Sequence, residues 1–169
     1  MNTLKNFVKK IPFIKFLLSV RSNSVFWANF IFQHILRINS NCKYSVHYTS
    51  CVVFPEKLLL WGNNPQKSLA LSPCCYLLSY NGIEINEGTL FGPGVKIISA
   101  NHKKNNLSEL EKNRPIKIGK NCWLGANVII LPGVELGDNT IVGAGAVVTK
   151  SYPQGNITLI GIPAHPAKF

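Results

Sequence analysis

The chain has 169 residues, of which 46% are hydrophobic, so it is long enough for one domain with a sizeable core. Its 18 Lys and Arg residues oppose 7 Asp and Glu residues, which gives a net charge of +11. Such a balance suits an anionic partner such as a nucleotide, a phosphorylated cofactor, nucleic acid or a membrane surface, and it also serves simple solubility. The five cysteines are odd in number and show no CxxC pair, which argues against a disulfide framework and for reduced thiols in the cytoplasm.

Residues 1–45 are expected to form a basic, partly helical cap, and the first 55 residues contain no acidic residue. Apolar residues from Leu4 onward follow helical spacing between lysines, although Pro12 interrupts the pattern. A second apolar and aromatic group at 25–36 predicts another helical segment. This region either covers the open end of the following domain or rests on an anionic membrane or beside a lipid-linked glycan. No apolar run has the length of a bilayer-spanning helix. The cysteines predict a cytoplasmic protein, and the membrane alternative would place it at the inner face of the membrane.

From residue 46 to 154 the sequence predicts a left-handed parallel β-helix, followed by a C-terminal segment at 155–169. The pattern is clearest in Pro115–Ser151, where inward aliphatic positions recur every six residues. They are Ile118, Leu124, Ile130, Leu136, Val142 and Val148, each with a second inward residue two places earlier. Asn or Gly recurs at the corners, as positive φ requires. Such repeats bury an apolar face only when their coils stack.

Three coils of 18 residues follow from this period: 83–100, 116–133 and 134–151. The motif WGNNPQK at 61–67 breaks the rhythm, which we expect to resume at Leu71. Glycine follows the inner residue at five positions, Gly92, Gly119, Gly125, Gly137 and Gly143, but Ile98, Leu131 and Thr149 stand there on the third face. We therefore expect the third face to contact a neighbouring subunit.

An inserted loop at 101–115 separates the first two of these coils without changing the phase of the repeat. Loops held on a rigid scaffold often carry function, and the second residue of this loop is His102. Its register predicts an outward side chain, and a neutral imidazole can accept a proton from a hydroxyl or an amine. A zinc site is the rival use of histidine, but the other histidines lie outside the regular coils, so no metal is expected. Cys122 should be buried and is a poor candidate nucleophile.

The stretch VKIISANH, the loop, the repeats from RPIKIG to VVTKS and the final GIPAHPAK together resemble the hexapeptide-repeat acetyltransferases. Within that family the chain is most similar to the small sugar and polysaccharide O-acetyltransferases, over residues 71–169. The resemblance implies a homotrimer with acetyl-CoA, its co-substrate, in a groove between adjacent prisms. It also implies a sugar or glycan acceptor and His102 as the general base.

The same resemblance implies a set of acetyl-CoA-binding residues. Backbone groups near Trp123, Gly125 and Ala126 match the donors for the oxyanion, and the small residues Gly143 and Ala144 would admit the pantetheine arm. Lys150 and Lys168 match basic positions near the nucleotide. The alternatives are N-acetylation of a nucleotide-linked amino sugar and a non-catalytic β-helix scaffold. Nucleic acid is not expected as a partner, because the basic residues form no recognisable binding module.

Overall fold

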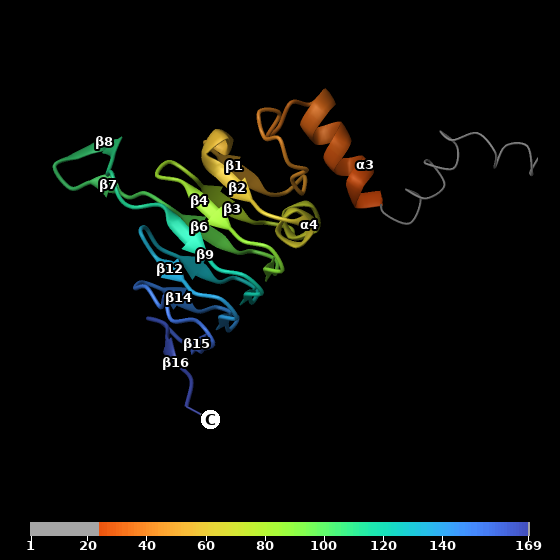
Figure 1. The fold of residues 1–169 in the computed structure, drawn as a ribbon. Helices are drawn as coiled ribbons and strands as arrows, with labels where there is room; N and C mark the ends of the chain where they lie inside the picture. The colour runs from red at the N-terminus through yellow and green to blue at the C-terminus, as the bar shows by residue number, and fades with distance from the viewer. Residues whose placement is uncertain (1–23, 169) are drawn as a thin grey trace, which may run out of the picture.

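The structure is a computed structural model that describes residues 24–168. Its main body is a three-sided prism built from three sheets of parallel strands, with one antiparallel strand at the C-terminal end (Figure 1). Face A holds β1 (Cys51–Val53), β3 (Tyr76–Leu78), β6 (Lys96–Ile98), β11 (Ile129–Ile130) and β14 (Val147–Val148). Face B holds β2 (Leu58–Leu60), β4 (Ile83–Ile85), β9 (Ile116–Ile118) and β12 (Glu135–Leu136). Face C holds β5 (Leu90–Phe91), β10 (Trp123–Leu124), β13 (Ile141–Val142), β15 (Thr158–Ile160) and β16 (His165–Pro166).

The chain visits faces B, C and A in turn, so each coil adds one strand to every face. The predicted left-handed β-helix is confirmed by this order, and the phase of the three coils by the pairing of Ile83 with Ile116 and of Lys117 with Glu135. All inward positions between 116 and 148 are at most 2% exposed. The corners are as predicted, because Asn121, Asn127 and Asn139 have positive φ, as do Gly133 and Gly145.

Two edges of the prism matter for the site. The C–A edge is the line of corners where the chain passes from face C to face A, at 92–95, 125–128 and 143–146. The A–B edge is the line where it passes from face A to face B, at 79–82, 99–115, 131–134 and 149–151. Face A lies between these edges, and its longest strands have three residues, or roughly 10 Å of extended chain.

Helix α4 (Asn63–Leu71) explains the break at WGNNPQK, since it stands where the first coil would supply a strand of face C. Our prediction that the repeat resumes at Leu71 is wrong: Leu71 ends this helix and is 45% exposed. Leu69 is the residue of this helix that fills the core. At the other end, β15 pairs in parallel with β13, so face C continues beyond residue 154. A short 3-10 helix, η2 (Pro55–Lys57), makes the A–B corner of the first coil.

The inserted loop contains an antiparallel hairpin that the sequence did not predict. Strand β7 (His102–Lys103) pairs with β8 (Asn106–Leu110), and the hairpin projects from the A–B edge (Figure 1). Both ends of the insertion return to one corner, which is why the register of the stack survives it.

Helix α3 (Ser24–Phe30) and the π-helix η1 (Ile31–Ile35) lie at the N-terminal end of the prism (Figure 1). A helical segment was predicted here, and α3 packs against α4. The helix expected from Leu4 onward lies outside the described residues. In the part of the chain that is described, no helix combines the length and apolar character needed to cross a bilayer.

Candidate active site

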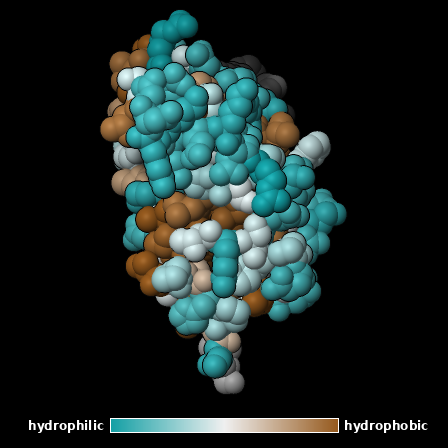
Figure 2. Space-filling model, turned by 90° about the vertical axis from the view of Figure 1, so that its left-hand side faces the viewer, coloured by the Kyte–Doolittle hydropathy of each residue, from teal (hydrophilic) through white to brown (hydrophobic). Residues whose placement is uncertain are grey.

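His102 begins strand β7 at the foot of the hairpin, and it is exposed as predicted. Its exposure does not come from a place in the six-residue repeat. His102 pairs with Leu110 inside the hairpin, whereas Lys117 of face B pairs with Glu84. No hydrogen bond or ion pair from another residue in 24–168 holds its imidazole. Figure 2 looks at this side of the molecule, where the hairpin forms a hydrophilic projection above a more hydrophobic surface.

Asn81 ties the hairpin to the scaffold from the preceding coil. Its Nδ2 donates to the carbonyl oxygen of Ser99 at 2.7 Å and to that of Glu111 at 3.0 Å, which are the residues entering and leaving the hairpin. Its backbone N–H also donates to Ser99 Oγ at 2.9 Å. One side chain therefore clamps both ends of the segment that carries His102. The sequence offered no signal for this role, because Asn81 looks like an ordinary turn residue.

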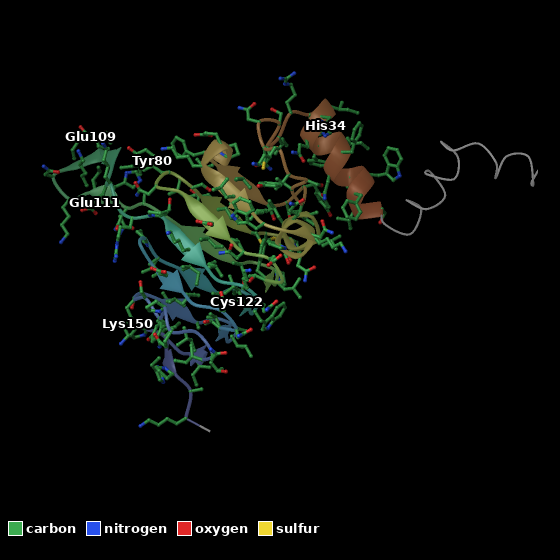
Figure 3. All side chains as sticks on the ribbon, viewed as in Figure 1. His34, Tyr80, Glu109, Glu111, Cys122 and Lys150 are labelled. Carbon is green, nitrogen blue, oxygen red and sulfur yellow. The ribbon has the colours of Figure 1, made fainter. Side chains whose placement is uncertain are left out.

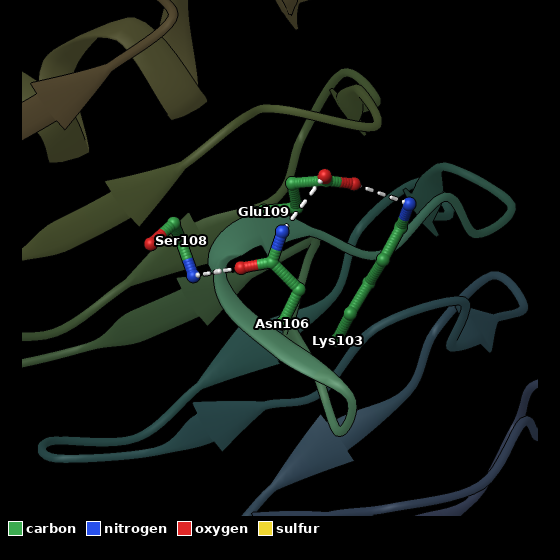
Figure 4. A network of polar contacts seen from close by, with 4 residues as sticks. All are labelled: Lys103, Asn106, Ser108 and Glu109. Atoms are coloured by element: carbon green, nitrogen blue, oxygen red, sulfur yellow. Dashed lines mark hydrogen bonds and ion pairs between the residues drawn. The ribbon is translucent and has the colours of Figure 1, made fainter.

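The tip of the hairpin is held by its own polar network (Figure 4). Lys103 Nζ lies 2.6 Å from Glu109 Oε2, and Asn106 Nδ2 donates to Glu109 Oε1 at 2.9 Å. The Ser108 N–H in turn donates to Asn106 Oδ1 at 3.1 Å. These contacts fix the shape of an exposed segment that has little apolar burial of its own.

Replacement of Asn81 by Ala is expected to loosen the hairpin while the stack stays folded. The change leaves two carbonyl groups without their amide donor, a loss of about 1 kcal/mol in the free energy of unfolding. Limited proteolysis should cut faster within 101–115 than in the parent protein, with the circular dichroism spectrum unchanged. The same change at Asn113, whose side chain only accepts the N–H of its neighbour Arg114 at 2.8 Å, is the control.

A hollow of about 590 Å³ lies between the hairpin and the corner at Tyr80, and sequence analysis did not find it. Its lining includes Tyr80, Lys103, Glu109, Leu110 and Lys112. The Tyr80 ring is held from behind by Phe54, with ring centroids 5.3 Å apart, and by Lys57, whose Nζ lies 5.0 Å from its centroid. An aromatic ring beside charged and hydroxyl groups has the chemistry to contact a sugar, and Leu110 is the strand partner of His102.

On the C–A edge the backbone N–H groups divide into those that stack the coils and those that remain free. The Trp123 and Gly125 N–H groups donate to the carbonyl oxygens of Thr140 and Val142 at 2.9 and 2.8 Å, so neither can serve the oxyanion as expected. The Gly143 N–H is likewise occupied, by Leu159. Ala126 N–H, in contrast, donates to no acceptor among residues 24–168.

Ala144 repeats the arrangement of Ala126 one coil further on. Its N–H also lacks an acceptor among the residues described, and its side chain is exposed. The glycine before each alanine is needed for packing, since a Cβ on Gly125 would lie 2.6 Å from Ala144 N. The C–A edge thus presents two free backbone N–H donors, those of Ala126 and Ala144, one coil apart and near the exposed Trp123.

Lys150 lies on the A–B edge, with its Nζ 5.7 Å from the centroid of the Tyr152 ring. Figure 3 shows it on the same side of the molecule as Glu109 and Glu111 of the hairpin. Lys168 is exposed near the C-terminus. One chain therefore places His102 and Lys150 on the A–B edge and the free N–H groups on the C–A edge, with face A between them.

Metal and thiol chemistry have little support in the described residues. No group of three His, Cys, Asp or Glu side chains within 24–168 is arranged to hold a metal ion. His47 packs on the Tyr48 ring at 4.5 Å, and burial lowers its pKa below the ordinary value. Cys122 is 2% exposed as predicted, and burial raises the pKa of its thiol, which keeps it protonated and unreactive.

Comparison with known proteins finds sequences and structures similar to this prism. Residues 115–150 match the family model described as the hexapeptide repeat of succinyl-transferase. Nodulation protein L of Rhizobium meliloti (strain 1021) is 42% identical over 63 residues, which cover 36% of this chain and 34% of that protein. Over the matched parts, the chain is similar to hexapeptide-repeat proteins and to acetyltransferases.

Two solved acetyltransferase structures extend the match to most of the prism. A maltose O-acetyltransferase from Clostridium difficile 630 is 34% identical, with a TM-score of 0.52 over 75% of this chain and 61% of its own. A galactoside acetyltransferase in complex with coenzyme A is 26% identical, with a TM-score of 0.51 over 71% of this chain and 62% of its own. The chain thus spans about a third of nodulation protein L and about three fifths of these two structures.

Proposed function

We propose that this protein is an acetyl-CoA-dependent O-acetyltransferase that modifies a hydroxyl group of a sugar or surface polysaccharide. One observation carries the proposal: an unpartnered histidine on a clamped hairpin and a ladder of free N–H donors occupy two edges of one rigid prism. A general base and an oxyanion donor are the two devices that acyl transfer to a hydroxyl requires. The similar galactoside acetyltransferase was solved with coenzyme A, which supports acetyl-CoA as the donor. The similar maltose O-acetyltransferase supports a sugar hydroxyl as the acceptor.

The two edges are separated by face A, so one copy does not assemble the site. A homotrimer would bring the A–B edge of one prism next to the C–A edge of another and so unite His102 with Ala126 three times. We expected face A to make the contact between subunits. The larger exposed apolar side chains of the prism lie on face C, where Leu90, Trp123 and Ile141 stand side by side and are 41–45% exposed. Face C is therefore a second surface for that contact.

In the proposed reaction the His102 imidazole removes the proton of the acceptor hydroxyl while the oxygen attacks the thioester carbon. The Ala126 N–H donates to the carbonyl oxygen as negative charge develops on it. The carbon–sulfur bond then breaks, and the imidazolium returns its proton to the departing thiolate. Lys150 and Lys168 would face the phosphates of the co-substrate, and the hollow at Tyr80 would receive the acceptor.

Acetyl-CoA supplied with separate panels of hydroxyl-only sugars and amino sugars tests the proposal. We expect release of free CoA thiol with hydroxyl-only acceptors and an ester in the product by mass spectrometry. Acetylation confined to amines would replace it with N-acetylation of an amino sugar. Absence of both CoA binding and transfer with every panel would favour a β-helix scaffold.

A further inference from the structure

The helical segment α3–η1 turns its two amide side chains inward and several large apolar side chains outward. Asn29 and Gln33 are only 1% and 5% exposed. Five large apolar residues of this segment and the turn after it are 43–65% exposed: Phe30, Ile31, Ile35, Leu36 and Ile38. We call these five residues the outward apolar patch. Helices on the surface of a globular protein normally show the opposite arrangement.

Hydrogen bonds of Asn29 fix the first part of this orientation. Its Nδ2 donates to the Ala70 carbonyl oxygen at 2.8 Å, and its Oδ1 accepts the Tyr48 N–H at 2.9 Å. The residue therefore connects α3 to both α4 and the turn before β1. A rotation of the helix that hid the patch would break both bonds inside the protein, where unpaired polar groups are costly.

Gln33 fixes the second part in the same way. Its Nε2 donates to the carbonyl oxygens of Cys42 and Tyr44, each at 2.9 Å, and its Oε1 accepts the Val46 N–H at 3.2 Å. The π-type bond from Leu36 N–H to the Ile31 carbonyl oxygen, 3.0 Å, closes the helix beside it. The amides of Asn29 and Gln33 are thus satisfied by backbone, and the patch is left facing solvent as a built feature of the fold.

The charges around the patch point to an anionic partner. Arg37 lies within it and Lys43 follows on the next turn, both exposed. The first acidic residue of the chain is Glu56, so residues 24–55 carry these two basic residues and no acidic one. A second copy of this chain would present the same positive charges and be repelled, whereas apolar side chains ringed by cations suit the interface of an acidic bilayer.

We propose that the outward apolar patch is a docking surface for an anionic lipid bilayer, with Phe30, Ile35 and Leu36 entering the interface and Arg37 and Lys43 facing the headgroups. Figure 1 shows α3 at the end of the prism opposite the C-terminus. The hairpin projects from the A–B edge, away from α3, so a bilayer bound at α3 would not cover it. The surface is independent of the proposed acetyl transfer.

Flotation of the full-length protein with vesicles tests the proposal. The wild type should float with vesicles of phosphatidylglycerol and phosphatidylcholine at low salt, and far less with phosphatidylcholine alone. The double substitution Ile35→Glu and Leu36→Glu should weaken vesicle binding by on the order of tenfold or more, because it places two negative charges on the face that would enter the bilayer. Both residues are exposed, so the melting temperature and circular dichroism should not change.

The double substitution Leu107→Glu and Ile162→Glu is the matched control, since it adds the same charge at sites that are 73% and 75% exposed and outside the patch. It should float like the wild type. Failure of the wild type to float with anionic vesicles would overturn the proposal, as would equal flotation of the Ile35/Leu36 variant. A lower oligomeric mass of that variant alone would make the patch an interface between copies.

Discussion

Replacement of His102 by Ala is expected to lower kcat by at least about a hundredfold with acetyl-CoA and a hydroxyl acceptor. Loss of a positioned general base has an effect of this size, because the hydroxyl must then lose its proton to water. KM for acetyl-CoA should change little, since His102 belongs to the A–B edge and the candidate donor groups to the C–A edge. Steady-state measurement of thiol release gives both parameters.

The structure supplies a control for this change. His34 is also exposed, but it lies on η1 at the far end of the prism (Figure 3). His34→Ala should therefore retain full turnover. His102 packs into no core cluster, so the melting temperature and oligomeric mass of the His102→Ala variant should match those of the wild type. Turnover that survives in this variant would remove His102 from the mechanism.

Replacement of Ala126 by Pro is expected to lower kcat by about 10²–10³, the effect of removing one oxyanion donor. Proline removes the Ala126 N–H, which makes no hydrogen bond between the stacked coils, and it adds no charge. The corner should accept it, because Asn127 follows with φ of 58° and proline is favoured at the preceding position of such a turn. The chain itself has Pro93 at the equivalent corner of the coil above.

Ala126→Ser is the matched control, since it changes the same side chain but keeps the N–H. It should retain turnover within a few-fold. Both variants should melt near the wild-type temperature, because the Ala126 N–H makes no bond that stacks the coils. Equal activity of the proline and serine variants would show that another group stabilises the oxyanion.

The period of the inward residues predicted the prism because every six-residue unit does the same thing. It forms a short strand that buries two side chains, and a turn follows the strand. Ile118 and Leu124 are fully buried for that reason, and the corner asparagines have the positive φ that the pattern required. His102 could be singled out because an insertion that keeps the phase is visible in the sequence. Its exposure followed from its place in that insertion.

The free and occupied N–H groups could not be predicted in this way. Trp123, Gly125 and Ala126 are neighbours in sequence, yet only Ala126 lacks an acceptor, and that depends on which carbonyl the next coil places beside each one. Asn81 was missed because its two acceptors, Ser99 and Glu111, are brought to it only by the stacked fold. Helix α4 was missed because a period of six gives no information about the segment that interrupts it.

Because Asn81 holds both ends of the hairpin at one corner, the hairpin can change in sequence and length without changing the prism. The stack pairs Ile83 with Ile116 across the insertion, so its stability does not depend on what the intervening residues do. Closing a longer loop adds little free energy, about 0.6 kcal/mol for each doubling of its length. Hairpins of other lengths and sequences can therefore be carried at this corner on an unchanged prism. Selection can vary the hairpin that carries His102 while the corners that carry the free N–H groups stay constant.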